Sequence, residues 1–168
     1  MPRPIVQIYE IQTPEEAQSV IAAGVDYIGS VIPSANSRHD PVIRKTVAQV
    51  RRMGAVSSLI PLYADPEAIF DTLDYYRPDI IHFCDRIEDP SGEAIESALA
   101  LQAEVKHRFS DVRITRSIPI GQRAGTRSQA IFELAARLES LSDYFLTDTV
   151  IEGDSGGGDA DQPVVGFV

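Results

Sequence analysis

The sequence predicts an α/β fold in which the strands of one parallel sheet alternate with helices. The main observation is a repeated helix start, in which a capping residue precedes a proline: Thr13-Pro14, Asp40-Pro41, Asp65-Pro66 and Asp89-Pro90. A Thr or Asp oxygen accepts from free N–H groups of the first turn, and proline suits the first helical position because that N–H has no partner anyway. The starts recur at intervals of about 25 residues, roughly one strand-plus-helix unit. Each start follows a strand-like run, and such regular alternation implies right-handed βαβ units.

Six strand-like runs and five helical patterns can be placed in order along the chain. The expected strands are Ile5–Ile11, Tyr27–Ile32, Val56–Tyr63, Ile80–Cys84, Val112–Ile120 and Tyr144–Asp148. Apolar residues at helical spacing follow each of the first five strands, and the fifth helix is expected over Ser128–Leu141. Gly24 and Gly54 end the first two helices, while Thr13 and Glu16 fit a capping box at the start of the first.

Composition limits the class of protein. The chain has 168 residues, typical of one domain over 1–168, and its 43% apolar content is enough for a core. A net charge of −10 argues against nucleic acid or an anionic membrane as the main partner. The single cysteine rules out an intrachain disulfide framework and fits a reducing cytoplasm. The N-terminus lacks the apolar run of a signal peptide, and no stretch approaches the roughly 18 apolar residues of a membrane span.

Two architectures fit this pattern: an open doubly wound sheet and a (β/α)8 barrel. No G-x-G-x-x-G follows the first strand, so a dinucleotide-binding fold loses weight. A barrel normally needs about 250 residues, whereas this chain supplies five strand-plus-helix units, a sixth strand and a tail with a Gly/Asp-rich loop at 152–163. We therefore expect a barrel to be incomplete, cut short at its C-terminal end.

Six motifs favour the barrel. They are Gln7–Ala17, Ala23–Ile32, Asn36–Arg38, Asp65–Ile69, Pro78–Asp85 and Phe145–Asp148. In that order they resemble K-I-C-G-I-T with P-E-D-A, A-G-A-D-x-I-G-F-V-F, S-P-R, D-P-E-E-I, L-D-x-V-Q-L-H-G and L-L-D of phosphoribosylanthranilate isomerase, a (β/α)8 barrel enzyme of tryptophan biosynthesis. The resemblance spans nearly all of the chain. It implies an incomplete TIM-type barrel with about six βα units.

The resemblance also implies a reaction, namely the aldose-to-ketose isomerisation of a small phosphorylated sugar-amine without a cofactor. This reaction needs an acid for the ring oxygen and a base for the proton on the second sugar carbon. Asp148 matches the family's acid, and Arg38 matches an arginine whose guanidinium holds the substrate. The family's base is a cysteine, and Tyr9 stands at that position. An unperturbed phenol has a pKa of about 10, which makes it a poor base at neutral pH.

Four further residues are candidates for substrate binding. Cys84 stands at the position of a family histidine, although a lone cysteine is more often a small buried apolar residue. Arg116, in the fifth strand, points into the barrel mouth or pairs with an acid elsewhere. Gly156 and Gly157 offer a loose counterpart of the family's phosphate loop. Acidic neighbours such as Asp154 oppose an anion there, so a linker is the favoured interpretation of that segment.

The histidines predict no metal site. His39, His82 and His107 are far apart and show no metal-ligand spacing. His82 lies in an apolar strand, which is more typical of a satisfied core histidine than of a catalyst.

Two functions therefore remain. The first is an enzyme resembling phosphoribosylanthranilate isomerase, which Asp148 and Arg38 favour. The second is a barrel that has lost this chemistry and acts as a binding or interaction protein, which Tyr9 and the acidic Glu10 beside it favour. An open sheet edge after the sixth strand would be prone to pairing with other molecules, so a homo-oligomer is one expectation.

Overall fold

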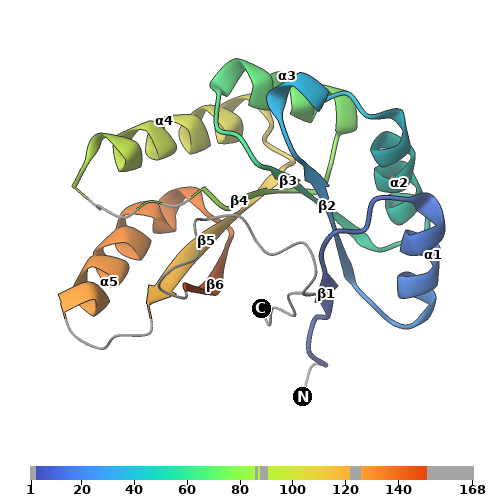
Figure 1. The fold of residues 1–168 in the computed structure, drawn as a ribbon, viewed down its shortest axis with the longest axis horizontal. Helices are drawn as coiled ribbons and strands as arrows, with labels where there is room; N and C mark the ends of the chain where they lie inside the picture. Colours follow the sequence, from blue (N-terminus) through green and yellow to red (C-terminus); the bar gives the residue numbers. More distant parts are fainter. Residues whose placement is uncertain (1–2, 86, 88–90, 122–125, 151–168) are drawn as a thin grey trace.

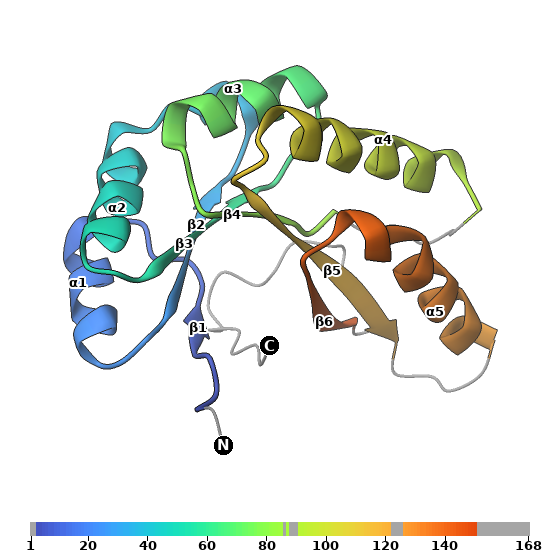
Figure 2. The same ribbon diagram turned by 180° about the vertical axis from the view of Figure 1, so that it is seen from behind.

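The computed structural model describes residues 3–85, 87, 91–121 and 126–150. Six parallel strands form one sheet in the order of the sequence, and helices separate them (Figures 1 and 2). The strands are β1 (Gln7–Ile8), β2 (Tyr27–Ile32), β3 (Val56–Pro61), β4 (Ile80–Phe83), β5 (Arg113–Gly121) and β6 (Tyr144–Val150). The helices are α1 (Pro14–Ala22), α2 (Pro41–Arg52), α3 (Pro66–Tyr76), α4 (Glu93–Arg108) and α5 (Thr126–Leu138), with short 3-10 turns at Ala35–Ser37 and Glu139–Leu141.

Ring contacts across the concave side show that the sheet is strongly curled. The ring centroids of Tyr27 on β2 and Tyr144 on β6 are 6.4 Å apart, although four strand spacings in a flat sheet would measure about 19 Å. Tyr9, directly after β1, similarly lies 5.7 Å from His82 on β4. Helices cover the convex side (Figure 1). The predicted fold, an incomplete (β/α) barrel, is confirmed.

Three of the four predicted helix starts are confirmed by their hydrogen bonds. The Asp40 carboxylate accepts from the backbone N–H groups of Val42 and Ile43, at 2.7 and 3.2 Å. Asp65 caps α3 in the same way, and Thr13 forms the predicted capping box with Glu16. The fourth start was placed wrongly. Helix α4 begins at Glu93 with Gly92 at its N-cap, whereas Asp89 and Pro90 lie outside the described residues.

The first strand is shorter than the predicted Ile5–Ile11, because the backbone turns at Glu10. Glu10 adopts a left-handed conformation, with φ of 62°, which an extended ladder cannot contain. The family motif has glycine here, the residue that reaches positive φ without strain. After the turn, the Ile11 N–H donates to the Gly29 carbonyl at 3.0 Å. The turn leaves Tyr9 at the carboxyl end of β1.

The apolar core lies between the sheet and its helices, which fixes the direction of alternate side chains. Ile81 and Phe83 of β4 pack in one cluster with Ile114 of β5 and with apolar residues of α3 and α4. Ile118 of β5 packs with α4 and α5. Since side chains alternate along a strand, His82 of β4 faces the concave interior. Thr115 and Ser117 of β5 face it as well.

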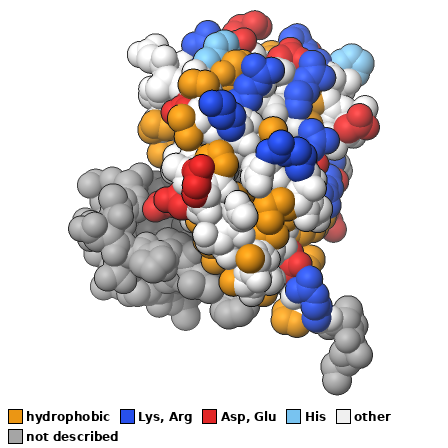
Figure 3. Space-filling model, turned by 90° about the vertical axis from the view of Figure 1, so that its right-hand side faces the viewer, with side chains coloured by type: hydrophobic (Ala, Val, Ile, Leu, Met, Phe, Trp, Pro, Cys, Tyr) orange, Lys and Arg blue, Asp and Glu red, His pale blue; other side chains and the backbone are white. Residues whose placement is uncertain are grey.

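Charge is unevenly distributed over the surface. Helix α2 contains no acid and exposes Arg44, Lys45, Arg51 and Arg52, in a chain whose net charge is −10. Figure 3 views the side of the molecule that carries α1 and α2, and lysine and arginine side chains gather there. No helix in the described part of the chain is long and apolar enough to cross a membrane.

Candidate functional site

The interior of the curled sheet holds a buried polar cluster built from three strands. His82 is 3% exposed, and its Nε2 atom lies 2.8 Å from the Oγ of Ser117. Its ring also meets the ring of Tyr9 at an interplanar angle of 50°. Parallel pairing of β4 with β5 sets this contact, because His82 is in register with Thr115. Residues 35 positions apart therefore share a hydrogen bond.

His82 is neutral at physiological pH. Burial is the main cause that lowers its pKa from 6.5 to about 4, and the positive charge of Arg116 lowers it further. Within the described part of the chain, Nδ1 has no hydrogen-bond partner. The prediction of a core histidine is confirmed by its burial. Only one of its two ring nitrogens is satisfied there.

Tyr9 occupies the interior because Gly29 leaves it room. A Cβ placed on Gly29 would lie 2.7 Å from Cδ1 of Tyr9, a distance that real Cβ atoms essentially never show, and 3.2 Å from Cδ1 of Ile60, which is tighter than most Cβ contacts. The phenol ring therefore packs across the backbone of β2. The sequence shows Gly29 only as part of the second motif and does not reveal this role. Nothing local signals it, because the contact joins two strands.

Asp148 is positioned by the last strand pair of the sheet. In the parallel register of β5 and β6, it stands opposite Pro119 near the carboxyl ends of both strands. Tyr9 follows the carboxyl end of β1, so both lie toward the end of the barrel where such folds hold their chemistry. The side chain of Asp148 lies outside the described part of the structure, as do Gly156 and Gly157. Their roles stay predictions.

Arg38 lies in the loop after β2 and is engaged by the protein itself. Its Nε donates to the carboxylate of Asp71 on α3, and its Nη1 donates to the carbonyl of Ala35 at 2.7 Å. The hydrogen bond from Arg38 lowers the pKa of Asp71, and His39 contributes through a 3.0 Å contact. A substrate carboxylate would have to compete with Asp71 for this guanidinium.

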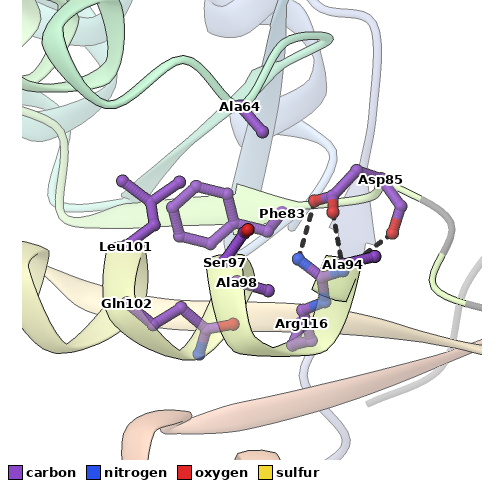
Figure 4. Close-up of a pocket in the computed structure, with 9 residues that line it drawn as sticks. All are labelled: Ala64, Phe83, Asp85, Ala94, Ser97, Ala98, Leu101, Gln102 and Arg116. Carbon is purple, nitrogen blue, oxygen red and sulfur yellow. Dashed lines mark hydrogen bonds and ion pairs between the residues drawn. The ribbon is translucent and has the colours of Figure 1, made fainter. Parts of the chain in front are cut away.

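Arg116 lies on the helix-facing side of the sheet, between Ile114 and Ile118 in the strand. Of the two positions that the sequence left open, the structure shows the pairing with an acid. Nη1 and Nη2 donate to the Asp85 carboxylate at 2.6 and 2.9 Å, and Nη2 also donates to the Asp85 carbonyl at 2.8 Å (Figure 4). Cys84, between β4 and Asp85, is half-buried and not in a disulfide. No cluster of metal-ligating residues occurs in the described ranges.

Comparison with solved structures places this geometry in a fold class. Phosphoribosylanthranilate isomerase from Thermotoga maritima matches with a TM-score of 0.63 and 15% identity, over 93% of this chain and 66% of that one. The enzyme from Pyrococcus furiosus matches with a TM-score of 0.62 and 15% identity, over 88% of this chain and 68% of that one. The C-terminal domain of ChiA from Legionella pneumophila matches with a TM-score of 0.57 and 14% identity, over 86% of this chain and 56% of that one.

These likenesses show the fold, a (β/α) barrel of the kind that phosphoribosylanthranilate isomerases have. The chain spans about two thirds of the length of those enzymes. No protein-family model and no curated protein matches the sequence. The likeness to ChiA illustrates that one barrel architecture serves different proteins, so function must be argued from residues.

Proposed function

We propose that the chain forms the main part of an isomerase of the phosphoribosylanthranilate type, which converts a phosphoribosyl-amine from the aldose to the ketose form. The observation that carries this proposal is the agreement between fold and motif order. Solved isomerases match 93% and 88% of the chain, and the six sequence motifs follow the order of that family. Tryptophan biosynthesis in the cytoplasm is the setting that this activity implies.

The reaction needs two proton transfers, and the candidate groups follow from the two edge strands of the sheet, β6 and β1. Asp148 on β6 would donate a proton to the ring oxygen of the sugar, which breaks the bond between that oxygen and the first carbon. A base would then remove the proton from the second carbon; the electron pair left there forms a double bond to the first carbon, whose double bond to nitrogen returns its electrons to nitrogen. The resulting enol becomes the ketose when a proton is added to the first carbon and the hydroxyl on the second carbon loses its proton. Tyr9 occupies the family's base position after β1 and would act as phenolate.

Substrate binding would draw on groups around the mouth. Arg38 would exchange Asp71 for the carboxylate of the substrate, because its guanidinium can donate a charge-assisted hydrogen bond to either one. Cys84 follows β4 at the same end of the sheet and would line the site. Gly156 and Gly157 would contact the phosphate of the substrate, as their loose match to the family's phosphate loop implies. Arg116 would act indirectly, since Asp85 holds its guanidinium behind the sheet.

The activity test follows the loss of phosphoribosylanthranilate fluorescence with the wild-type protein and three variants. Asp148→Asn should lower kcat by about 100-fold or more, the usual contribution of a general acid. Asp111→Asn removes an exposed acid from the opposite end of β5 and should leave kcat unchanged. Tyr9→Cys restores the family's base and should raise kcat. Wild-type protein that neither turns over nor binds millimolar substrate would contradict the proposal.

One observation favours the second candidate, a barrel repurposed for binding. Tyr9 packs against Gly29 and His82, so a large ring fills part of the interior where the family has a small cysteine. If the wild type is inactive and Tyr9→Cys is also inactive, the loss of chemistry does not depend on this ring alone. The binding function then becomes the better account.

A further inference from the structure

Helix α2 presents a strip of positive charge on the convex side of the sheet, where lysine and arginine side chains gather (Figure 3). Its exposed face carries Arg44, Lys45 and Arg52, and the helix contains no acid. Among the described residues, none of these three forms an ion pair with a carboxylate. Arg44 lies over the ring of Tyr75, with its Cζ atom 4.6 Å from the ring centroid, and Arg52 donates to the side chain of Gln49.

Arginines elsewhere on the convex side pair with an acid of the neighbouring helical turn. Arg108 on α4 pairs with Glu104 at 2.6 Å, and Arg77 at the end of α3 pairs with Asp74 at 2.8 Å. The helix dipole does not account for the strip either, because a cation stabilises a helix near its C-terminus and Lys45 lies in the first half of α2. The strip is therefore free to bind an anionic partner.

The charge of the whole chain restricts what that partner is. Nucleic acid and anionic membranes extend far beyond one helix, so they would also meet the rest of a chain whose net charge is −10. A short acidic segment of a protein stays over the strip. More distant charges of the chain then act weakly on it, because interactions between exposed charges are largely screened beyond about 8 Å at physiological salt. Clusters of basic residues are a recurring means of recognising acidic protein segments.

The spacing along α2 favours a helical segment. Lys45 and Arg52 are seven positions apart, which is two helical turns or about 10 Å. Carboxylates seven positions apart on a partner helix have the same spacing and share one face, whereas seven positions along an extended segment turn the two side chains to opposite faces. Val42 and Met53 are 44% and 37% exposed, and eleven positions, close to three turns, place them on one side of the strip.

We propose that α2 docks an acidic amphipathic helix of a partner protein. Carboxylates of that helix bind Lys45 and Arg52, and its apolar side chains pack on Val42 and Met53. The docking surface is independent of the proposed isomerase, because none of the residues assigned to acid, base or substrate binding belongs to it. Exposed ion pairs are individually weak, so we expect a dissociation constant on the order of 100 µM at low salt.

The probe is a fluorescently labelled helical peptide of about 15 residues, with glutamates seven positions apart and leucines eleven positions apart beside them. Its binding to the full chain, followed by fluorescence anisotropy, should saturate and should weaken at least ten-fold when salt is raised from about 0.05 to 0.5 M. A peptide of the same composition in scrambled order should bind at least five-fold more weakly. Equal binding of the scrambled peptide would overturn the proposal, and so would tighter binding of short single-stranded DNA or of vesicles with anionic lipid at the same salt.

Matched substitutions at exposed positions keep the test specific. Lys45→Glu should weaken peptide binding by ten-fold or more, because it replaces an attraction with a repulsion. Arg108→Glu makes the same change in net charge on α4 and should leave the affinity within about two-fold. Val42→Ser should weaken binding about three-fold, whereas Leu62→Ser, at an exposed apolar position just after β3, should not. Equal affinities of the Lys45 and Arg108 variants would show that the peptide responds only to overall charge, which would equally overturn the proposal.

Discussion

The two faces of β4 and β5 are both buried, yet they accommodate polar side chains in different ways. On the concave face, His82 is neutral at physiological pH, because burial lowers its pKa to about 4. It shares one hydrogen bond with Ser117. On the helix side, Arg116 cannot lose its proton and instead recruits Asp85 from the loop after β4. A buried histidine can therefore become neutral by losing its proton, whereas a buried arginine stays charged and needs an acidic partner.

The comparison also shows that the buried arginine of β5 lies on the opposite face of the sheet from the interior where the family's reaction would occur. Arg116 is a fully buried arginine of β5, but it lies in the helix-facing layer. In the interior, the buried pair of His82 and Ser117 carries no charge, and a charged side chain on the same face, Arg113, donates to the Tyr144 hydroxyl at 2.8 Å. The charge of Arg116 still reaches through the sheet, because it contributes to the low pKa of His82. The faces are thus electrostatically coupled.

The largest effect should come from the buried ion pair. Arg116→Ala should lower the free energy of unfolding by about 4 kcal/mol, because it removes a fully buried side chain and both bonds to Asp85. Urea unfolding followed by circular dichroism measures this. Arg108→Ala breaks an exposed pair with Glu104 and should cost less than about 1 kcal/mol. Equal losses would show that Arg116 is not part of the core.

The neutral, buried imidazole of His82 on the interior face should make stability depend on pH. The pKa of His82 is about 4 in the folded chain and 6.5 when unperturbed, so between these values only the unfolded chain holds the proton. Stability should therefore fall by about 3 kcal/mol as pH drops from 6.5 to 4. His82→Gln should remove this part of the dependence, and His107→Gln, at an exposed position, should retain it. Unchanged curves for His82→Gln would contradict a neutral buried imidazole.

The smallest effect concerns the fit of Tyr9 in the interior. Gly29→Ala places a Cβ 2.7 Å from the Tyr9 ring and should cost about 2 kcal/mol by overpacking. Tyr9→Cys should recover most of that loss in the double variant, because it removes the ring atom that clashes. Thermal unfolding of the two single variants and the double variant provides the measurement. Additive losses would mean that the two residues do not touch.

The sequence by itself determined the repeating units of this protein. Thr13, Asp40 and Asp65 cap helices through bonds to N–H groups only two or three residues away, so their effect is local and readable. Gly24 and Gly54 have positive φ just after the helices they follow, a conformation that glycine adopts freely. The motif order indicated the barrel. The sequence also placed Asp148 at the end of its predicted strand, whereas it placed Tyr9 inside the predicted strand Ile5–Ile11.

Only the tertiary structure decided which groups meet. Tyr9 reaches His82 because the sheet curls, and no local pattern records that curvature. Arg38 is held by Asp71, 33 positions later in the chain, and Arg116 by Asp85, 31 positions earlier. The face to which Arg116 points follows from strand alternation once Ile114 and Ile118 are packed under helices. Capping depends on adjacent residues, whereas side-chain pairing depends on how distant strands and helices pack.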